Sequence, residues 1–446
     1  MDDLLELGDR LVTMAAPDEQ VEVVLGAGRG TSVRAYDGEI EAFTSATSRA
    51  IGVRVVVDGR QGFASAGTLD DGVAVETLAE ARDNALFAQP DEHVGLAEPD
   101  GVEPIPLDPW SPVVGEMTDG ERIELAIDLE RRVRSGDPRI TGVRSASYGD
   151  AQSTGAIVSS TGIRVAGRST HAGVSVLALA ADGDDTTTGY GYDSGRDHTD
   201  LDIERVADDA VERSTAMLGA TKPASARLAI VLEPRFAASL LGIAAGMLSG
   251  ERVLKGRSPF AERLGEKIAA PMLTLVDDPT DARSIAADDH DGEGLATRRN
   301  VLFAAGELRT FLYDSYSARR AGTASTASAV RSARSTPSVG IQALAVEPGT
   351  GSVDDLVGGI DLGIAVHSMS GLHSGVNAVS GDFSVGVEGH MIRAGARAEP
   401  VREATIASTI PRMLLDLRAI ADDLTWLPSG AAMCTMAIDG VTLGGT

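Results

Sequence analysis

The sequence predicts a chain of the α+β class, and three patterns lead to that prediction. Segments with apolar residues at helical spacing are followed by segments in which apolar and polar residues alternate one by one. Asp-Gly pairs stand between the alternating segments, and such pairs favour β-hairpins because both residues tolerate positive φ. In the C-terminal half, Gly, Ser and Asp separate many short apolar pieces, which favours a closed or sandwiched antiparallel sheet over a βαβ array.

These patterns predict an N-terminal α/β region with an antiparallel meander and a C-terminal antiparallel β-barrel-like domain with helices. We expect the first domain to comprise residues 1–95. Its expected elements are a helix over 1–15, a strand over 21–25, a meander over 31–69 with turns at Asp37-Gly38 and Asp58-Gly59, and a helix over 72–88.

Six prolines between residues 89 and 116 exclude a long helix or a central strand there, and they suggest a domain boundary. We therefore expect a central α+β domain over 96–222 and a C-terminal β-rich domain over 223–446. The central domain is predicted to contain helices at 119–135 and 201–218 and strands within 140–192, with a turn at Ser160-Thr161-Gly162. The C-terminal domain is predicted to contain a strand at 226–232, a helix at 235–248, short strands near 272–276, 301–303, 312–313, 340–345 and 363–366, and a last long helix at 403–422.

The composition indicates an acidic protein of the cytoplasm. Asp and Glu outnumber Lys and Arg by 66 to 39, so the formal charge of −27 repels nucleic acid and anionic membranes. Only three of the basic residues are Lys, which suits a salt-rich cytoplasm, although a GC-rich coding sequence also favours Arg. The single cysteine excludes an intrachain disulfide and fits a reducing compartment. The N-terminus lacks the pattern of a secretory signal, and no apolar run is long enough to span a bilayer.

Three sequence blocks resemble the TldD/PmbA (TldE) family of peptidase proteins. They are Gly250 to Phe260 with Leu264 to Lys267 and Asp277-Asp278-Pro279, then Phe311 to Arg320, and then Gly371 to Asn377 with Val379 to Ser384. The order of the three blocks makes a chance match improbable. The resemblance implies a cytoplasmic, heteromeric protease assembly that degrades peptides or unfolded polypeptides.

In the zinc-binding members of that family, a helix carries a His-Glu-x-x-x-His motif whose imidazoles bind the metal. The equivalent positions here are Gly242, Ile243 and Met247. Glycine has no side chain, isoleucine has no lone pair, and a thioether is a poor zinc ligand. Cys434 lies in the region of a further family ligand, but its neighbours differ from that context. The resemblance therefore indicates the metal-free PmbA/TldE-type subunit, with no catalytic residue and no cofactor of its own and with zinc in a TldD-like partner.

Two other constellations are weaker candidates for chemistry. His367 and His373 could hold a metal, yet two imidazoles make an incomplete site, and a hydrogen-bonded loop histidine is the alternative. Ser374, His373 and Asp382 have the chemistry of a catalytic triad, but adjacent residues direct their side chains apart. The Gly-x-Ser-x-Gly pattern of a serine hydrolase is absent from the sequence.

Seven residues of the family blocks are candidates for contact with substrate or partner: Tyr313, Asp314, Arg319, His373, Ser374, Asn377 and Asp382. For Tyr313-Asp314 and Arg319-Arg320, the alternative is a tyrosine in the core and a solvated pair of arginines. The function predicted is that of the non-metal-binding subunit, and it is open whether the lone chain is an enzyme. An independent hydrolase with an unrecognised site and a non-enzymatic homo-oligomeric scaffold or modulator are the alternatives.

Overall fold

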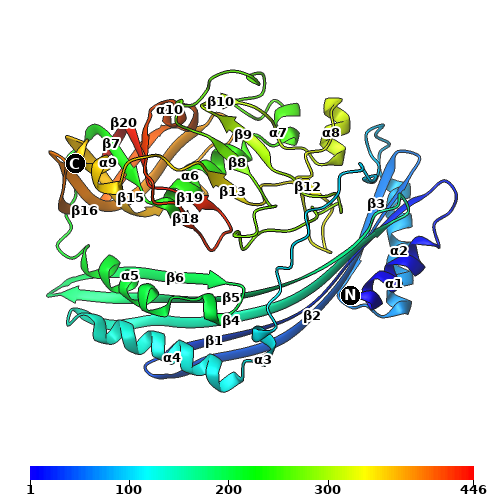
Figure 1. Cartoon of the computed structure of the whole chain (residues 1–446), viewed down its shortest axis with the longest axis horizontal. Coiled ribbons are helices and arrows are strands. Elements are labelled where there is room, and N and C mark those ends of the chain that lie inside the picture. The colour runs from blue at the N-terminus through cyan, green and yellow to red at the C-terminus, as the bar shows by residue number, and fades with distance from the viewer.

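A computed structural model describes residues 1–446 and has two parts, a long curved sheet and a compact lobe (Figure 1). The N-terminal half forms the sheet, and the C-terminal half lies above it in that view. The strands of the sheet follow the order β3-β2-β1-β4-β5-β6, and all its pairings are antiparallel. The six strands are β1 (Gln20–Tyr36), β2 (Glu39–Val57), β3 (Arg60–Ala66), β4 (Ile140–Ser159), β5 (Arg164–Asp182) and β6 (Asp185–Gly195).

The hairpins of this sheet form where the Asp-Gly pairs predicted them. Asp37 and Gly38 join β1 to β2 with φ of 56° and 78°, and Asp58 and Gly59 join β2 to β3 with φ of 50° and 67°. Positive φ at both central residues gives the turn the twist that antiparallel strands need. The meander and both turns are confirmed, although β1 is one strand of 17 residues where the pattern predicted two pieces.

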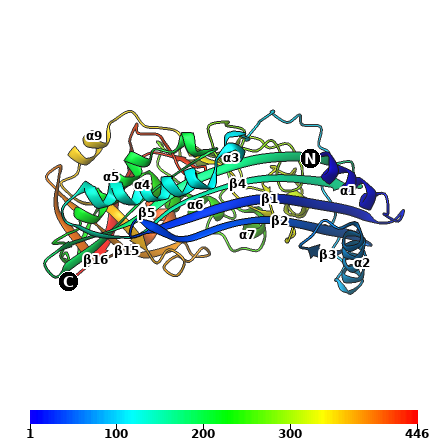
Figure 2. The same cartoon turned by 90° about the horizontal axis from the view of Figure 1, so that it is seen from below.

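Helices cover the sheet at its two ends, as Figure 2 shows from below. Near the N-terminus, α1 (Asp2–Val12) and α2 (Asp71–Phe87) enclose a core of 14 buried residues. At the other end, α4 (Asp119–Gly136) and α5 (Ile203–Thr215) enclose a core of 16. The start of α4 is fixed by a capping box, in which the Thr118 hydroxyl and the Glu121 carboxylate satisfy each other's backbone N–H groups. The four long helices predicted in this half are confirmed within a few residues.

The C-terminal half contains a closed barrel of five strands, as the sequence predicted. β16 pairs with β15 on one side and with β20 on the other, which closes the order β16-β15-β14-β7-β20. The pair β7 and β14 is parallel, and the other pairs are antiparallel. The barrel strands are β7 (Ala226–Leu232), β14 (Leu362–Ser370), β15 (Asp382–Arg393), β16 (Ala396–Thr409) and β20 (Met436–Gly444).

A second six-stranded sheet, β10-β9-β8-β13-β19-β18, packs with the barrel around a shared core of 45 buried residues. Its strands are β8 (Leu275–Asp277), β9 (Asn300–Ala304), β10 (Glu307–Leu308), β13 (Leu344–Val346), β18 (Thr425–Trp426) and β19 (Ala432–Met433). The remaining elements are α3 (Val113–Glu116), η1 (His198–Asp200), α6 (Pro234–Gly246), α7 (Gly250–Leu254), α8 (Ser315–Ala321), β11 (Ala329–Val330), β12 (Ser338–Val339), α9 (Val353–Gly358), α10 (Ile410–Leu415) and β17 (Leu417–Ile420).

The long helix predicted over 403–422 is wrong. β16 continues to Thr409, α10 has only six residues, and β17 follows at Leu417. Pro411 explains the difference, because proline fits the first turn of a helix, where α10 places it, and not the interior of a longer one. The strand predicted at 312–313 is also absent, since Leu312 forms only an isolated bridge with Ser249.

One sheet spans the first two predicted domains, because β1 and β4 pair from Glu22 with Ser159 to Ala35 with Ala146. The predicted boundary at 95/96 lies in the extended connection between α2 and α3, and the boundary at 222/223 lies between α5 and β7. The division into three domains stays a prediction. None of the helices combines the length and the apolar character that crossing a bilayer requires.

Asp277, on β8, should make stability depend on pH. Its Oδ1 accepts hydrogen bonds from the backbone N–H groups of Gln342 and Ala343, at 3.0 and 2.7 Å, but its buried Oδ2 has no partner. Burial raises the pKa of this carboxyl to about 6, from 3.8. The folded state therefore keeps a proton that the unfolded state loses, so this stabilisation is complete below about pH 4 and is lost as pH rises through 6.

Between about pH 4 and pH 7, we expect the wild-type protein to lose about 3 kcal/mol of unfolding free energy relative to Asp277→Asn. Chemical denaturation at a series of pH values measures this difference. Asp354→Asn changes an exposed carboxylate and is the control. Parallel pH profiles for wild type and Asp277→Asn would contradict the prediction.

Candidate functional site

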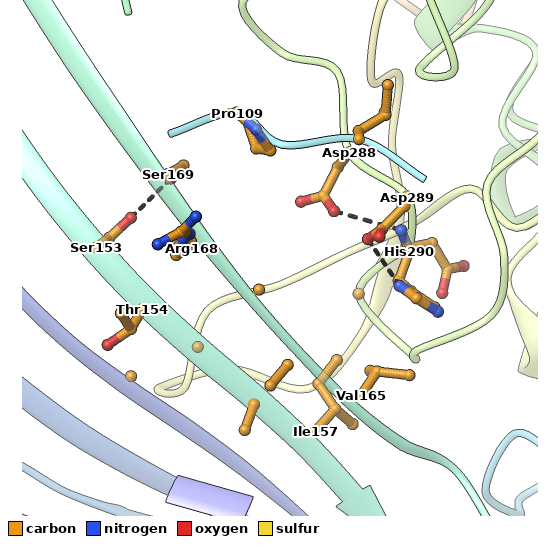
Figure 3. Close-up of a pocket in the computed structure, with 18 of the residues that line it drawn as sticks. Pro109, Ser153, Thr154, Ile157, Val165, Arg168, Ser169, Asp288, Asp289 and His290 are labelled. Atoms are coloured by element: carbon orange, nitrogen blue, oxygen red, sulfur yellow. Dashed lines mark hydrogen bonds and ion pairs between the residues drawn. The ribbon is translucent and has the colours of Figure 1, made fainter. Parts of the chain in front are cut away.

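A cavity of about 790 Å³ lies between the long sheet and the C-terminal half. The sheet contributes residues 24–26 of β1, 153–157 of β4 and 165–171 of β5, and the connection before α3 contributes residues 107–109. The opposite wall consists of the C-terminal loop 285–292, of β11 with the loop that follows it (residues 329–333), and of Ile341 and Gln342. Figure 3 shows the two walls facing each other, with Ser153, Arg168 and Ser169 on the sheet and Asp288 to His290 across from them.

Three glycines form a row across the sheet wall of the cavity. Gly26 of β1 pairs with Gly155 of β4, which pairs in turn with Gly167 of β5. Residues directly opposite on neighbouring strands share one face, so all three face the cavity they line. A Cβ added at Gly26 or Gly167 meets no atom within 4 Å. The row therefore leaves open space in which another backbone can approach the sheet closely.

The C-terminal wall is rich in carboxylates. Asp289 contacts the ring of His290, with 2.8 Å between Oδ1 and Nδ1. Asp288 is accessible from the cavity but is surrounded by protein, and this burial raises its pKa. Asp291 is buried and accepts hydrogen bonds from the backbone N–H groups of Glu293, Leu295 and Ala329, at 2.9, 3.0 and 3.1 Å. This aspartate organises the wall, and its neighbours are accessible to a bound molecule.

Basic groups line the sheet wall opposite these carboxylates. Arg168 stacks on the ring of Trp110, with 5.2 Å between its Cζ atom and the ring centroid, and donates to the Asp108 carboxylate of the same wall at 3.2 Å. Arg196 reaches across and donates to the Ser284 carbonyl at 3.0 Å. Burial, followed by the charge of Arg196, lowers the pKa of His171. The cavity thus presents both signs of charge on opposite walls.

A group of buried charges joins the two walls behind the cavity. Arg54 of β2 donates to the Glu22 carboxylate of β1 at 3.0 and 2.9 Å, and Arg331 of the C-terminal loop binds the same carboxylate. Arg54 also lies 3.8 Å from Glu293. Burial by itself raises the pKa of Glu22, but the charges of Arg54 and Arg331 outweigh it and hold that pKa below its usual value. The four side chains are at most 4 % exposed.

Tyr313, Asp314 and Arg319 lie away from the cavity and make contacts within the chain. The Asp314 carboxylate caps α8 by accepting from the Ser317 backbone N–H at 2.8 Å. Arg319 donates to the carbonyls of three residues of the connection that follows α2, His93, Gly95 and Leu96, at 2.7 to 3.2 Å. Burial raises the pKa of Tyr313. Contact of these residues with a substrate or partner stays a prediction.

His373, Ser374 and Asn377 are exposed on the loop between β14 and β15, and Asp382 is exposed at the first position of β15. The Asn377 side chain accepts from the Val379 backbone N–H at 2.9 Å, and Asp382 accepts from the Ser380 hydroxyl at 2.6 Å. The Ser374 hydroxyl donates to the Gly371 carbonyl and makes no hydrogen bond with His373 or Asp382. The loop is thus held by its own turns, and its accessible side chains stay candidates for partner contact.

The positions at which the family resemblance implies metal ligands in zinc-binding members do not fit a metal here. Gly242 and Ile243 lie on α6, Ile243 packs against the main core, and Met247, which ends the helix, is fully buried in that core. Cys434 is fully buried too, and burial followed by the charges of Asp423 and Asp422 raises the pKa of its thiol to about 12. A protonated thiol and a thioether among apolar side chains offer a divalent cation no anionic ligand.

His367 and His373 are not brought together. His367 lies on β14, where its Nδ1 stands 3.7 Å from Glu233 and its ring packs edge-on against His390 at 4.9 Å. Burial lowers the pKa of His367 to about 4, so the imidazole is neutral. Across residues 1–446, no three His, Cys, Asp or Glu side chains are grouped so that they could hold a metal ion.

The cavity is suited to binding and lacks an assembled nucleophile. The ring of His290 is oriented by Asp289, but no hydroxyl or thiol forms a hydrogen bond with that ring. The walls of the cavity offer carboxylates, guanidinium groups and open strand surface. Together these groups suit the charges and the amide groups of an extended polypeptide.

None of the seven predicted contact residues lines the cavity, and the residues that do were missed. The sequence contained one usable signal, the run Asp288-Asp289-His290-Asp291, which places four titratable side chains in succession. Gly26, Gly155 and Gly167 carried no signal, because their alignment depends on the register of three strands that are distant in sequence.

A long antiparallel sheet that encloses a cavity with a barrel-containing lobe defines the class of this protein. Three family models describe such proteins and together match most of the chain: PmbA/TldA metallopeptidase domain 1 over residues 21–88, the central domain over 113–218 and the C-terminal domain over 225–445. The chain belongs to the PmbA/TldD metallopeptidase family.

Relatives named PmbA and relatives named TldD both resemble the chain over nearly its whole length. The metalloprotease PmbA of Escherichia coli O157:H7 is 27% identical over 90% of this chain and 87% of its own. A metalloprotease TldD homolog of Haemophilus influenzae is 26% identical over 92% of this chain and 89% of its own. The crystal structure of TldE from Thermococcus kodakarensis has the same fold, with a TM-score of 0.88, 23% identity and complete coverage of both chains.

We expect Glu22→Gln to lower the free energy of unfolding by about 3 to 5 kcal/mol, because it leaves two buried guanidinium groups without their carboxylate. Chemical denaturation measures the loss. Arg164→Gln removes another long-range ion pair, with Asp9, whose side chains are 52 % and 42 % exposed. Arg164→Gln is the control and should lower the free energy of unfolding by less than about 1 kcal/mol. Equal losses in the two variants would refute a special role for the buried charges.

Proposed function

We propose that this chain is the metal-free subunit of a TldD/TldE-type protease complex that degrades peptides or unfolded polypeptides. One observation carries the proposal: the helix that bears the metal ligands in zinc-binding relatives has only Gly242, Ile243 and Met247 at the ligand positions. The burial of Met247 and Cys434 supports it, because neither sulfur atom is accessible to a hydrated cation.

A TldD-like homologue is the proposed source of the zinc. Relatives named PmbA and TldD both align with nearly all of this chain, which supports a partner of the same fold. In such an assembly, zinc-activated water would attack the peptide carbonyl at the partner's site. This chain would contribute walls, substrate contacts and stability.

The role proposed for the cavity is to hold an extended stretch of the polypeptide substrate. Support comes from the open glycine row, which admits a second backbone, and from the opposed charged walls, which tolerate side chains of either sign. The net charge of −27 and the scarcity of lysine support a site of action in a salt-rich cytoplasm.

The proposal is tested by zinc analysis and peptide cleavage in concentrated salt. The purified chain alone should contain less than stoichiometric zinc and should not cleave unfolded peptides. Addition of a zinc-bearing TldD-like homologue should give cleavage that a chelator abolishes, and the activity of the mixture should exceed that of the homologue alone.

The outcome also separates the alternatives. Cleavage by the lone chain after exhaustive chelation would favour an independent hydrolase. A mixture no more active than the homologue, together with a stable homo-oligomer of this chain, would favour a scaffold or modulator. Stoichiometric zinc in the lone active chain would refute the metal-free assignment.

Gly167→Phe tests the role of the cavity. The new side chain meets no protein atom at its Cβ, so the variant should fold, but its ring would occupy the space above the glycine row. We expect kcat/KM of the mixed complex for long unfolded peptides to fall by about tenfold or more, equivalent to about 1.4 kcal/mol of lost binding.

Gly67→Phe is the matched control, because Gly67 is exposed, has open space at its Cβ and lies outside the cavity. It should leave kcat/KM close to the wild-type value. Unchanged cleavage by a correctly folded Gly167→Phe complex would exclude the cavity as the substrate path.

A further inference from the structure

The contact between the two halves of the chain contains little apolar packing. The four larger hydrophobic clusters each lie within one half, two in the long sheet with its helices and two in the C-terminal half. A cluster of only four buried residues joins the halves, with Ala97 and Ile163 from the first and Leu295 and Ala327 from the second. Separation of the halves at this contact therefore exposes far less apolar surface than unfolding of either half does.

The turn formed by residues 291–295 connects the C-terminal wall of the cavity to the sheet. Leu295 enters the shared apolar cluster, and Glu293 lies 3.8 Å from Arg54 of β2. A Cβ added at Gly294 would lie 2.5 Å from a side chain of the sheet, so the turn approaches the sheet as closely as glycine allows. Any group that fixes the shape of this turn therefore also fixes the contact between the halves.

The Asp291 carboxylate is that group. It accepts hydrogen bonds from two N–H groups of the turn itself and from the N–H of Ala329, which lies two residues before Arg331. The N–H of Gly292 donates to the Ala329 carbonyl at 2.8 Å. Arg331 then binds Glu22 of the sheet. One carboxyl group thus holds both loops in the arrangement in which they reach the sheet.

Asp291 itself has no counter-ion. Burial, followed by the charge of Glu293, raises its pKa to about 7, from 3.8. The charged and titratable groups around the turn are Asp288, Asp289, His290 and Glu293 of the same loop, Arg331 after β11, Glu22 of β1, Arg54 of β2, and Asp314 and Arg319 at α8. Behind the cavity, three guanidinium groups thus face three carboxylates, and an ionised Asp291 adds a negative charge without a partner.

The contact is also incompletely satisfied at Arg331. Its Nη1 binds Glu22, but its buried Nε and Nη2 atoms have no hydrogen-bond partner. Unpartnered donors make the closed arrangement less stable, and water would satisfy them once the wall separated from the sheet. The covalent connection between the halves, residues 216–225, lies at the end of the molecule away from α8 in Figure 1, so it can serve as a pivot.

From these observations we propose that Asp291 is an acid–base latch between the two halves. Its protonated carboxyl holds the C-terminal wall on the sheet, and its ionisation raises the population of an open state in which residues 285–297 and 327–334 separate from the sheet. The closed arrangement stays the major one. That the latch regulates entry of a polypeptide rests on the role proposed for the cavity, whereas the latch itself does not.

Hydrogen exchange of the full-length chain, followed by mass spectrometry at a series of pH values, tests the latch. After correction for the intrinsic exchange rate, the opening constant of residues 285–297 and 327–334 should rise by about tenfold or more between pH 5 and pH 7 and level off near pH 7. The reason is that hydrated Asp291 of the open state loses its proton more readily than the buried group. Low concentrations of urea should hardly change this constant, because little surface is exposed.

Two variants and a control assign the effect to Asp291. Asp291→Asn removes the titration, so the corrected opening constant should become nearly independent of pH. Glu293→Gln removes the neighbouring charge and keeps the length of the side chain, so levelling off should move to lower pH. Asp277→Asn is the matched control, because Asp277 is another buried carboxyl with a raised pKa but lies on β8. It should leave the pH dependence of residues 285–297 unchanged.

Three results would overturn the proposal: a corrected opening constant that does not change with pH in the wild type, a rise with pH that Asp291→Asn retains, or a steep dependence on urea, which would show that these amides exchange only through global unfolding. The exchange experiment needs neither a TldD-like homologue nor peptide cleavage. An inactive mixed complex would therefore count against the proposed function, and a pH-dependent opening measured on the chain alone would still support the latch.

Discussion

The position of the C-terminal half over the long sheet depends on charges that are buried between them. Glu22 binds Arg54 of its own sheet and Arg331 of the opposite loop, and all three are almost fully buried. Removing an ion from water costs several kcal/mol, and only good pairing offsets that cost. If the loop moved away, Arg331 would lose its carboxylate without gaining full hydration. The two halves are therefore held in one arrangement, and the cavity between them has a defined shape.

This constraint determines what the cavity can recognise. Arg331 lines the cavity but uses its charge on Glu22, and Arg168 is paired with Asp108 of its own wall, so the remaining charges are those of Arg196 on one wall and of Asp288 and Asp289 on the other. Opposite charges on facing walls do not select a ligand of one sign. They suit a ligand that carries both signs along an extended backbone, and the glycine row provides the surface on which such a backbone lies.

Local features of this fold could be read from the sequence, and features created by long-range pairing could not. Asp37-Gly38 and Asp58-Gly59 specify their turns through their own φ preferences, so the meander was predictable. The helix expected at 403–422 failed because apolar spacing was weighed without Pro411, which can begin a helix but not continue one. The cavity could not be foreseen, since residues near 26, 155, 167 and 290 meet only after β1, β4 and β5 are in register.

The apolar residues at the end of α6 follow from the cost of burying a polar group. A histidine at position 247 would be buried beside apolar side chains, which is costly unless a metal or hydrogen bond satisfies it, whereas burial of a methionine stabilises the core by about 1.5 to 3 kcal/mol. Where no metal is bound, the core favours the apolar residue.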